Sequence, residues 1–218
     1  MEKRLYRYMS AENALKTLES MQLRVGRINE LNDPFEFVPG LKNVGDHTPE
    51  HLIQDTQEAL LNYYNDNLGI ICFSESIEDP VLWSHYANSH KGIALGFDYE
   101  MSDNILEVQY CSDRVTADLD KFLNLPENEQ LDFVNSVLSI KAPSWSYESE
   151  YRVLIPLDEC ELHSGSYFIK IPENFLYEVI LGIRCTVEEK YLKRLFKDNS
   201  DVNIKKAKRD ILQFKVNI

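Results

Sequence analysis

The stretch Gly69-Ile70-Ile71-Cys72-Phe73-Ser74 decides the fold class of this chain. It is an almost unbroken apolar run of strand length, which is typical of a central β-strand covered on both faces. Its last residue is polar, so we expect Ser74 where the strand ends, a place at which sheet proteins commonly present functional groups. A turn or helix-capping role for Ser74 is an equally good interpretation.

Strand-like and helix-like segments surround this run on both sides. Strands are expected near residues 5–8, 23–25, 92–97, 151–155, 167–171, 178–181, 202–204 and 211–216. Helices are expected near residues 11–20, 49–65, 80–87, 127–140 and 187–196, with Ser10 and Thr48 as N-caps and Pro49 at a first helical position. The pattern predicts an α+β fold for residues 1–218, a single domain with a curved mixed or antiparallel sheet and flanking helices.

The composition is that of an ordinary globular protein, with 44% hydrophobic and 27% charged residues in 218. No apolar run approaches the roughly 20 residues that cross a bilayer, and the first residues lack a signal-peptide core, so we expect a cytoplasmic protein without a membrane partner. Four cysteines without a C-x-x-C pair favour reduced thiols over a zinc knuckle or a disulfide framework: Cys72, Cys111, Cys160 and Cys185.

A net charge of -13 argues against non-specific attraction to nucleic acid or to an anionic membrane. The charge is uneven, because residues 98–132 hold ten acidic and two basic side chains, whereas residues 190–209 hold eight basic and two acidic ones. A solvated surface explains this distribution more simply than an anion or nucleic-acid site does.

The segment richest in possible chemistry is Trp145-Ser146-Tyr147-Glu148-Ser149-Glu150-Tyr151-Arg152. On a strand, Glu148, Glu150 and Arg152 would share one face, because side chains alternate. Such an array could hold a nucleophile or a ribose hydroxyl with one carboxylate and orient the other through the guanidinium. The plainer interpretation is a surface strand with a Glu150–Arg152 pair.

Two further segments carry candidate groups. Asn32-Asp33-Pro34-Phe35-Glu36 predicts a turn, because proline biases the preceding residue away from helix. Trp83, His85 and Tyr86 lie close together on a short helix, where His85 could act as an acid or base, although a lone histidine beside aromatic rings is more often a packed side chain.

Abundant carboxylates allow a metal hypothesis. Asp33, Glu36, Glu75, Glu78 and Asp79 could together bind a hard cation through oxygen. The chain has no calcium loop, zinc helix, glycine-rich phosphate motif or Gly-x-Ser-x-Gly elbow, so the sequence predicts neither a bound metal nor a Ser-His-Asp hydrolase.

Four separate motifs, taken in order, resemble the bacterial domain-of-unknown-function family 2971. They are Leu5-Tyr6-Arg7-Tyr8 with Ala14-Leu15, Leu31 to Glu36, Cys72 to Glu75 with Leu82 to Ala87 and Lys91 to Ile93, and Lys141 with Trp145 to Arg152. The chain is more remotely similar to the abortive-infection AbiGi proteins of phage defence.

A still more distant resemblance is to ADP-ribosyltransferases, which use NAD as co-substrate and no tightly bound cofactor. It implies catalytic roles for Glu150, Glu148 and Arg7, with Arg7 on the pyrophosphate, Ser74 bracing its strand and a carboxylate acting on the ribose. Candidate binding residues for a nucleotide are Tyr6, Tyr8, Asn32, Asp33, Ser74, Trp83, His85, Tyr86, Trp145 and Arg152. The chain departs from the ADP-ribosyltransferase pattern in two respects. Its serine-bearing strand lacks the Ser-Thr-Ser run, and Tyr6 and Tyr8 fit the position of the first-strand residue as well as Arg7 does.

Three functional hypotheses therefore stand. The first is an NAD-using, ADP-ribosyltransferase-like enzyme of phage defence or toxin-antitoxin type, whose target would be a protein or a nucleic acid. The second is a non-catalytic binding or regulatory domain, in which the same motifs lock the fold. The third is a metal-dependent nuclease or phosphodiesterase.

Overall fold

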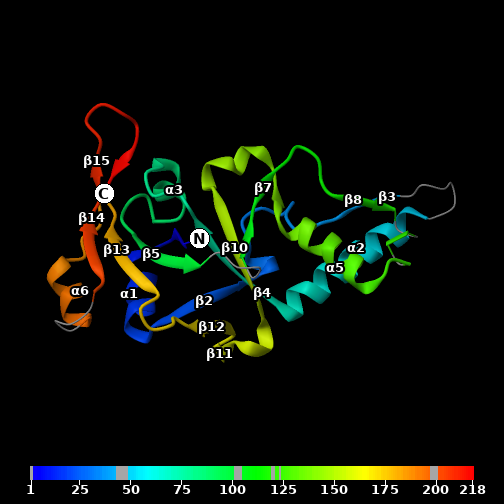
Figure 1. Ribbon diagram of the computed structural model, residues 1–218, viewed down its shortest axis with the longest axis horizontal. Helices are drawn as coiled ribbons and strands as arrows, with labels where there is room; N and C mark the ends of the chain where they lie inside the picture. The colour runs from blue at the N-terminus through cyan, green and yellow to red at the C-terminus, as the bar shows by residue number, and fades with distance from the viewer. Residues whose placement is uncertain (1, 43–48, 101–104, 119–120, 123, 197–200) are drawn as a thin grey trace.

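The strand expected at residues 69–74 lies inside the main sheet of the protein. A computed structural model describes residues 2–42, 49–100, 105–118, 121–122, 124–196 and 201–218, and over these residues the sheet has ten strands (Figure 1). Its main path runs β11-β12-β2-β4-β1-β5-β13-β14, and β10 pairs with both β4 and β6. The pairs are antiparallel except β13 with β14, so the sheet is mixed and the predicted α+β class is confirmed.

The bounds of the elements follow the chain. The strands are β1 (Glu2–Met9), β2 (Gln22–Arg27), β3 (Gly40–Lys42), β4 (Leu68–Ser74), β5 (Ile93–Glu100), β6 (Ile105–Glu107), β7 (Gln109–Tyr110), β8 (Thr116–Asp118), β9 (Ile140–Lys141), β10 (Glu150–Pro156), β11 (Glu161–His163), β12 (Ser166–Lys170), β13 (Leu176–Leu181), β14 (Asn203–Lys206), β15 (Lys208–Arg209) and β16 (Val216–Asn217). The helices are α1 (Ala11–Ser20), α2 (Glu50–Asn67), α3 (Pro80–His85), α5 (Glu127–Leu138) and α6 (Glu189–Leu195), with short 3-10 turns at Ile28–Glu30, Pro143–Glu148 and Leu157–Glu159.

The two faces of the sheet pack against different helices. Leu5, Leu95 and Val179 belong to a core that includes side chains of α1 and α6. Ala94 and Ile180, on the opposite face because neighbouring side chains alternate, pack with Trp83 of α3. The near-continuous apolar strands of the sequence are therefore explained by burial on both sides.

The strands β1 and β2 pair with opposite ends of the same edge of β4 and diverge between them. We call this divergence the strand fork, and it positions the candidate site. One edge of β4 pairs with β10 along its whole length. On the other edge β2 pairs at Gly26↔Ile70, whereas β1 pairs only at Tyr6↔Ser74. Between these points the described residues supply no strand partner for residues 71–73 on that edge, because β1 and β2 diverge there.

Most predicted elements are present, with corrections at two places. Ser10 caps α1 through a hydrogen bond from the Asn13 amide, whereas Pro49 precedes α2 instead of opening it and Thr48 lies outside the described residues. The predicted strand at 211–216 is wrong, because the Asp210 carboxylate accepts hydrogen bonds from the Leu212 and Gln213 amides and turns the chain. No helix in the described part of the chain is both long enough and apolar enough to cross a membrane.

Gly92 offers a direct test of how closely these elements pack. A Cβ atom there would lie 2.1 Å from the Met9 carbonyl oxygen and 2.9 Å from the Ala87 Cα, and backbone atoms cannot move aside as a flexible side chain can. We expect Gly92→Ala to lower the free energy of unfolding by about 1–3 kcal/mol, measured by denaturant titration. Gly26→Ala is the matched control, because its Cβ would meet its nearest atom at 3.6 Å, and equal losses in both variants would contradict the packing.

Candidate functional site

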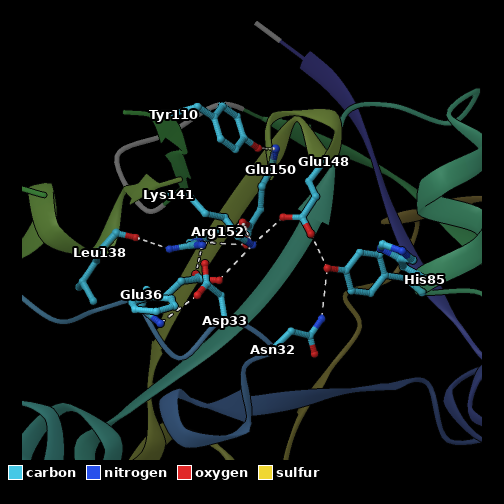
Figure 2. Close-up of polar contacts among 12 residues, drawn as sticks. Asn32, Asp33, Glu36, His85, Tyr110, Leu138, Lys141, Glu148, Glu150 and Arg152 are labelled. Carbon is cyan, nitrogen blue, oxygen red and sulfur yellow. Dashed lines mark hydrogen bonds and ion pairs between the residues drawn. The ribbon is translucent and has the colours of Figure 1, made fainter. Parts of the chain in front are cut away.

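A buried cluster of five charged side chains lies beside β4 and β10 (Figure 2). The Lys141 Nζ lies 3.1 Å from Glu36 Oε1, 2.6 Å from Glu148 Oε2 and 3.1 Å from Glu150 Oε2. The Arg152 guanidinium, 1% exposed, donates from Nε to Glu150 Oε1 and from Nη2 to Glu150 Oε2, both at 2.9 Å, and from Nη2 also to Glu36. Two cations therefore hold three carboxylates away from water.

Local structure explains how Glu148 and Glu150 reach the same cluster. The segment predicted as one strand is a 3-10 turn over Pro143–Glu148, followed by Ser149 in the left-handed region at φ 43° and then by β10. The Ser74 hydroxyl donates to the Glu148 carbonyl at 2.5 Å, and the Glu150 amide donates to the Tyr110 hydroxyl at 2.9 Å. The two carboxylates thus converge, but through a turn and not through strand alternation.

The interpretation of this segment as a surface strand is wrong. The predicted Glu150–Arg152 pair exists, but Glu148, Glu150 and Arg152 are all buried, and β10 is an inner strand that pairs with both β4 and β6. A buried ion pair needs additional hydrogen bonds to offset the loss of hydration. The Leu138 carbonyl supplies one by accepting from the Arg152 Nη1 at 2.8 Å.

The cluster shifts the ionisation of its members in opposite directions. Burial raises the pKa of the Glu150 carboxyl, but the Arg152 guanidinium and the Lys141 ammonium outweigh it and hold that pKa at about 2. Burial raises the pKa of Glu36, and its two cationic neighbours reduce that rise without cancelling it. Burial lowers the pKa of Lys141, but the three carboxylates more than reverse the effect and raise it. Glu150 and Lys141 are therefore both firmly ionised at neutral pH.

A cavity of about 240 Å³ occupies the fork beside this cluster. Its lining comes from β1, β2, β4, β10 and the segments around α3 and β9: Tyr6, Arg7, Tyr8, Arg24, Gly26, Glu30, Leu31, Asn32, Glu36, Ile70, Cys72, Phe73, Ser74, Leu82, Tyr86, Lys141, Glu148 and Glu150. Arg24 and Glu30 are exposed and form an ion pair, so the cavity reaches the surface there.

Arg7 is the unusual member of the lining. Its Nη2 donates to the Arg24 carbonyl at 2.8 Å, but its Nη1 is buried and has no hydrogen-bond partner among the described residues. Burial lowers the pKa of the Arg7 guanidinium to about 10. Buried N–H groups of a cation are normally satisfied, so Arg7 presents an unused donor at the fork.

Arg7 also approaches the cavity from an unexpected direction. Alternation along β1 points its side chain away from Tyr6 and Tyr8, toward the face that carries Leu5. Arg7 and Glu150 nevertheless line the same cavity, because the divergence of β1 and β2 opens the sheet at this point.

The structure brings eight of the predicted site residues to this cavity. They are Tyr6, Arg7, Tyr8, Asn32, Ser74, Tyr86, Glu148 and Glu150. Arg152 stands behind the lining as the partner of Glu150. Asp33, Trp83, His85 and Trp145 are not among the lining residues.

These four residues have other roles in the fold. Asp33 accepts a hydrogen bond from the Phe35 amide and stabilises the predicted turn. Trp83 is fully buried and donates to the Ile77 carbonyl, so it is a core residue. Trp145 covers the Lys141 ammonium, which lies 4.8 Å from the centre of its ring.

His85 is connected to the cluster through phenols. Its Nδ1 shares a hydrogen bond of 3.0 Å with the Tyr147 hydroxyl, and the Tyr147 phenol interacts electrostatically with Tyr86. The Tyr86 hydroxyl in turn donates to Glu148 Oε1 and accepts from the Asn32 amide nitrogen. A row of polar groups therefore leads from an exposed histidine to a buried carboxylate.

The carboxylates of the metal hypothesis do not gather. Glu36 pairs with Lys141 and Arg152, Glu75 with Lys3 and Glu78 with Lys215, whereas Asp79 caps α3. Among the described residues no group of three or more His, Cys, Asp or Glu side chains has the arrangement of a metal site.

Sequence reasoning misses three members of the site. Lys141 enters only through the family resemblance, Glu36 falls in the metal set, and Cys72 is expected as a reduced thiol inside the central strand. Cys72 lines the cavity, and burial raises the pKa of its thiol. The signal that could have found it is alternation, because Cys72 lies two residues before Ser74 on β4 and shares its face.

Fold and site together define an α+β protein with a buried charge cluster beside a polar cavity at a strand fork. Residues 82–153, about a third of the chain, match the family model described as "Protein of unknown function (DUF2971)". The expected resemblance to this family is confirmed over the matched residues, which include Lys141, Glu148, Glu150 and Arg152. Comparison with curated proteins and with solved structures found no significant match.

Glu150→Gln tests the energetics of the cluster. The folded-state pKa of about 2 lies below the ordinary 4.5, so ionised Glu150 stabilises the fold above pH 4.5 and loses this effect as the pH falls toward 2. At neutral pH we expect the variant to be less stable by roughly 3 kcal/mol, because Arg152 and Lys141 lose a buried partner. Urea titrations at stepped pH should show this deficit shrinking between pH 4.5 and 2.

The exposed Glu12, paired with Lys16 on α1, supplies the control. Glu12→Gln should leave the unfolding free energy without a measurable change, because exposed ion pairs contribute little. A deficit for Glu150→Gln that is absent, or that stays constant across the acid range, would contradict the assigned role of the cluster.

Proposed function

We propose that this protein is an NAD-using enzyme of the ADP-ribosyltransferase type and that its site is the cavity at the strand fork. The observation that carries the proposal is that an arginine with an unused donor, a strand-end serine and two glutamates line one cavity, although they come from distant parts of the chain. Their order along the chain, Arg7, Ser74, Glu148 and Glu150, is the order that the resemblance implies.

Arg7 is assigned to the pyrophosphate of NAD. The Arg7 Nη2 donates to the Arg24 carbonyl, but its buried Nη1 has no acceptor among the described residues, and a phosphate oxygen would form a charge-assisted hydrogen bond with it. The cavity volume of about 240 Å³ lies just below the usual range for small-molecule pockets. Only part of a dinucleotide would therefore be enclosed, with the remainder over the exposed Arg24 and Glu30.

The two glutamates are assigned to the nicotinamide ribose. A carboxylate oxygen has two lone pairs, so Glu150 can accept a ribose hydroxyl while it remains bound to Arg152. Its negative charge, held in place by Arg152 and Lys141, would stabilise an oxocarbenium-like transition state without rearrangement of the site. The C–N glycosidic bond breaks, nicotinamide leaves with the electron pair, and the nucleophile bonds to the ribose carbon.

The proton that the nucleophile loses needs an acceptor. Glu148 is the suitable carboxylate, because in the described part of the chain its carboxylate is hydrogen-bonded only by Lys141 and Tyr86, whereas both cations hold Glu150. The row of polar groups formed by Tyr86, Tyr147 and His85 would then carry the proton to the surface. A nucleophile on a protein or a nucleic acid, and a role in phage defence or as a toxin, are further parts of this proposal that come from the family resemblance.

Arg7→Met separates ligand binding from folding. The variant removes a cation that is buried without full pairing, so we expect the free protein to melt at the same temperature as the wild type or higher. NAD at 100 times its dissociation constant should stabilise the wild type by about 2.7 kcal/mol and the variant hardly at all. Differential scanning calorimetry with and without NAD measures both effects.

Lys16→Met is the control, because Lys16 on α1 is an exposed cation paired with Glu12 and is not among the residues that line the cavity. It should retain most of the NAD-induced shift. If Arg7→Met melts lower than the wild type and still responds fully to NAD, Arg7 has a structural role and the proposal is wrong.

A second candidate function is a non-catalytic binding or regulatory domain. It is favoured by one observation, namely that all four carboxylate oxygens of Glu148 and Glu150 already accept hydrogen bonds within the protein. In that case the stability that the cluster gives the fold is its whole role, and the response to ligands distinguishes this candidate from the first. NAD, ADP-ribose and nicotinamide would each leave the melting temperature unchanged, and incubation with NAD would release no nicotinamide.

A further inference from the structure

The end of the chain carries an apolar surface that the site does not use. Ile211, Leu212 and Phe214 are each at least 89% exposed, at the tip of the hairpin formed by β15 and β16. Figure 1 shows this hairpin projecting from the body of the protein. Three neighbouring large apolar side chains in water are uncommon unless the surface binds something.

The tip is held in one conformation. The Asp210 carboxylate accepts from the Leu212 and Gln213 amides at 2.7 Å each and from the Asn217 side chain at 2.8 Å, and the Asp210 amide donates to the Lys215 carbonyl. A loop that is already ordered loses less conformational entropy when it docks. The apolar residues are therefore presented in advance and do not depend on a partner for their shape.

The hairpin is basic in a strongly acidic protein. Residues 205–218 contain five Lys and Arg and one Asp, a net charge of +4, whereas the whole chain carries -13, which leaves -17 on the remaining residues. Lys208 and Arg209 are exposed beside the apolar tip. The surface that best complements this hairpin is acidic with exposed apolar side chains.

Helix α2 has these properties. It contains four acidic residues and no Lys or Arg over residues 50–67, and none of its residues is buried. Leu52 and Tyr63 are its large exposed apolar side chains. In Figure 1 α2 lies at one end of the protein and the hairpin at the other, so the two surfaces cannot meet within one chain.

We propose that the C-terminal hairpin docks onto helix α2 of a second copy of this chain. With the two surfaces at opposite ends of the molecule, two antiparallel copies satisfy both contacts at once through a two-fold axis, which closes the assembly as a dimer. The arrangement buries both apolar tips and brings each basic hairpin to an acidic helix. This inference is independent of the proposed enzymatic function.

Sedimentation velocity over a dilution series tests the assembly. The wild type should sediment at twice the 25.4 kDa of the chain at high concentration, and the dimer should weaken as salt is added. The variant with Ile211→Ser, Leu212→Ser and Phe214→Ser should be monomeric throughout. A wild type that stays monomeric at low salt, or a dimer that the triple variant leaves intact, overturns the proposal.

A charge exchange identifies the surface that receives the hairpin. Lys208→Glu with Arg209→Glu should abolish the dimer, and Asp55→Lys with Glu58→Lys on α2 should abolish it as well. A mixture of the two variants should form a heterodimer held by one native contact and one contact with its charges reversed, and failure of the mixture to associate overturns the assignment to α2. The altered side chains are exposed, and unchanged circular dichroism spectra verify that each variant is folded.

Two controls establish that the C-terminal tip acts specifically and that its partner is a protein surface. Leu162→Ser, an exposed leucine on the hairpin of β11 and β12, should leave the dimer unchanged, and loss of the dimer in this variant contradicts a specific role for the C-terminal tip. Vesicles of phosphatidylserine and phosphatidylcholine should not bind the wild type. Binding that requires the three apolar residues, with a monomeric protein in solution, would show a membrane-binding hairpin and overturn the proposal.

Discussion

The ion pair between Arg152 and Glu150 is the interaction on which the site depends. It lies within β10, which pairs with the whole of β4, and it reaches Glu36 across 116 positions of the sequence. Lys141 completes the cluster by contacting the same carboxylates from β9. Because removal of one buried charge leaves the others uncompensated, these segments are coupled energetically as well as spatially.

The fork in the sheet is the second constraint, and it gives the cluster access to a cavity. A β4 strand paired on both edges throughout would leave no opening between β1 and β2. Two hydrogen bonds stabilise the fork at the end of β4 where β1 pairs with Ser74. The Ser74 hydroxyl donates to the Glu148 carbonyl, and the Tyr8 hydroxyl donates to the Ser76 carbonyl. Rigid surroundings of this kind can hold carboxylates in place for a ligand, because hydrogen bonds and packing fix the side chains that line the cavity.

The sequence predicted the parts of the structure that depend on local pattern. Apolar runs located β4, β5 and β10, and the turn at Asn32 to Glu36 followed from its proline. Strand alternation predicted that Glu148 lies beside Glu150, and the two carboxylates do converge. The arrangement comes instead from a 3-10 turn followed by Ser149 in the left-handed region. The apolar residues at 211–214 resembled a strand, but the Asp210 turn leaves them in solvent.

Burial of the charges and the identity of their partners could not be read from the sequence. The contact of Glu36 with Arg152 joins residues that no local pattern relates, and the lack of a partner for the Arg7 Nη1 among the described residues is a property of the fork alone. These two features have different meanings. A cluster in which all four carboxylate oxygens of Glu148 and Glu150 accept hydrogen bonds is explained by stability, whereas a buried donor without an acceptor destabilises the free protein. Arg7, more than the two glutamates, is therefore the residue on which the proposed binding of an anion depends.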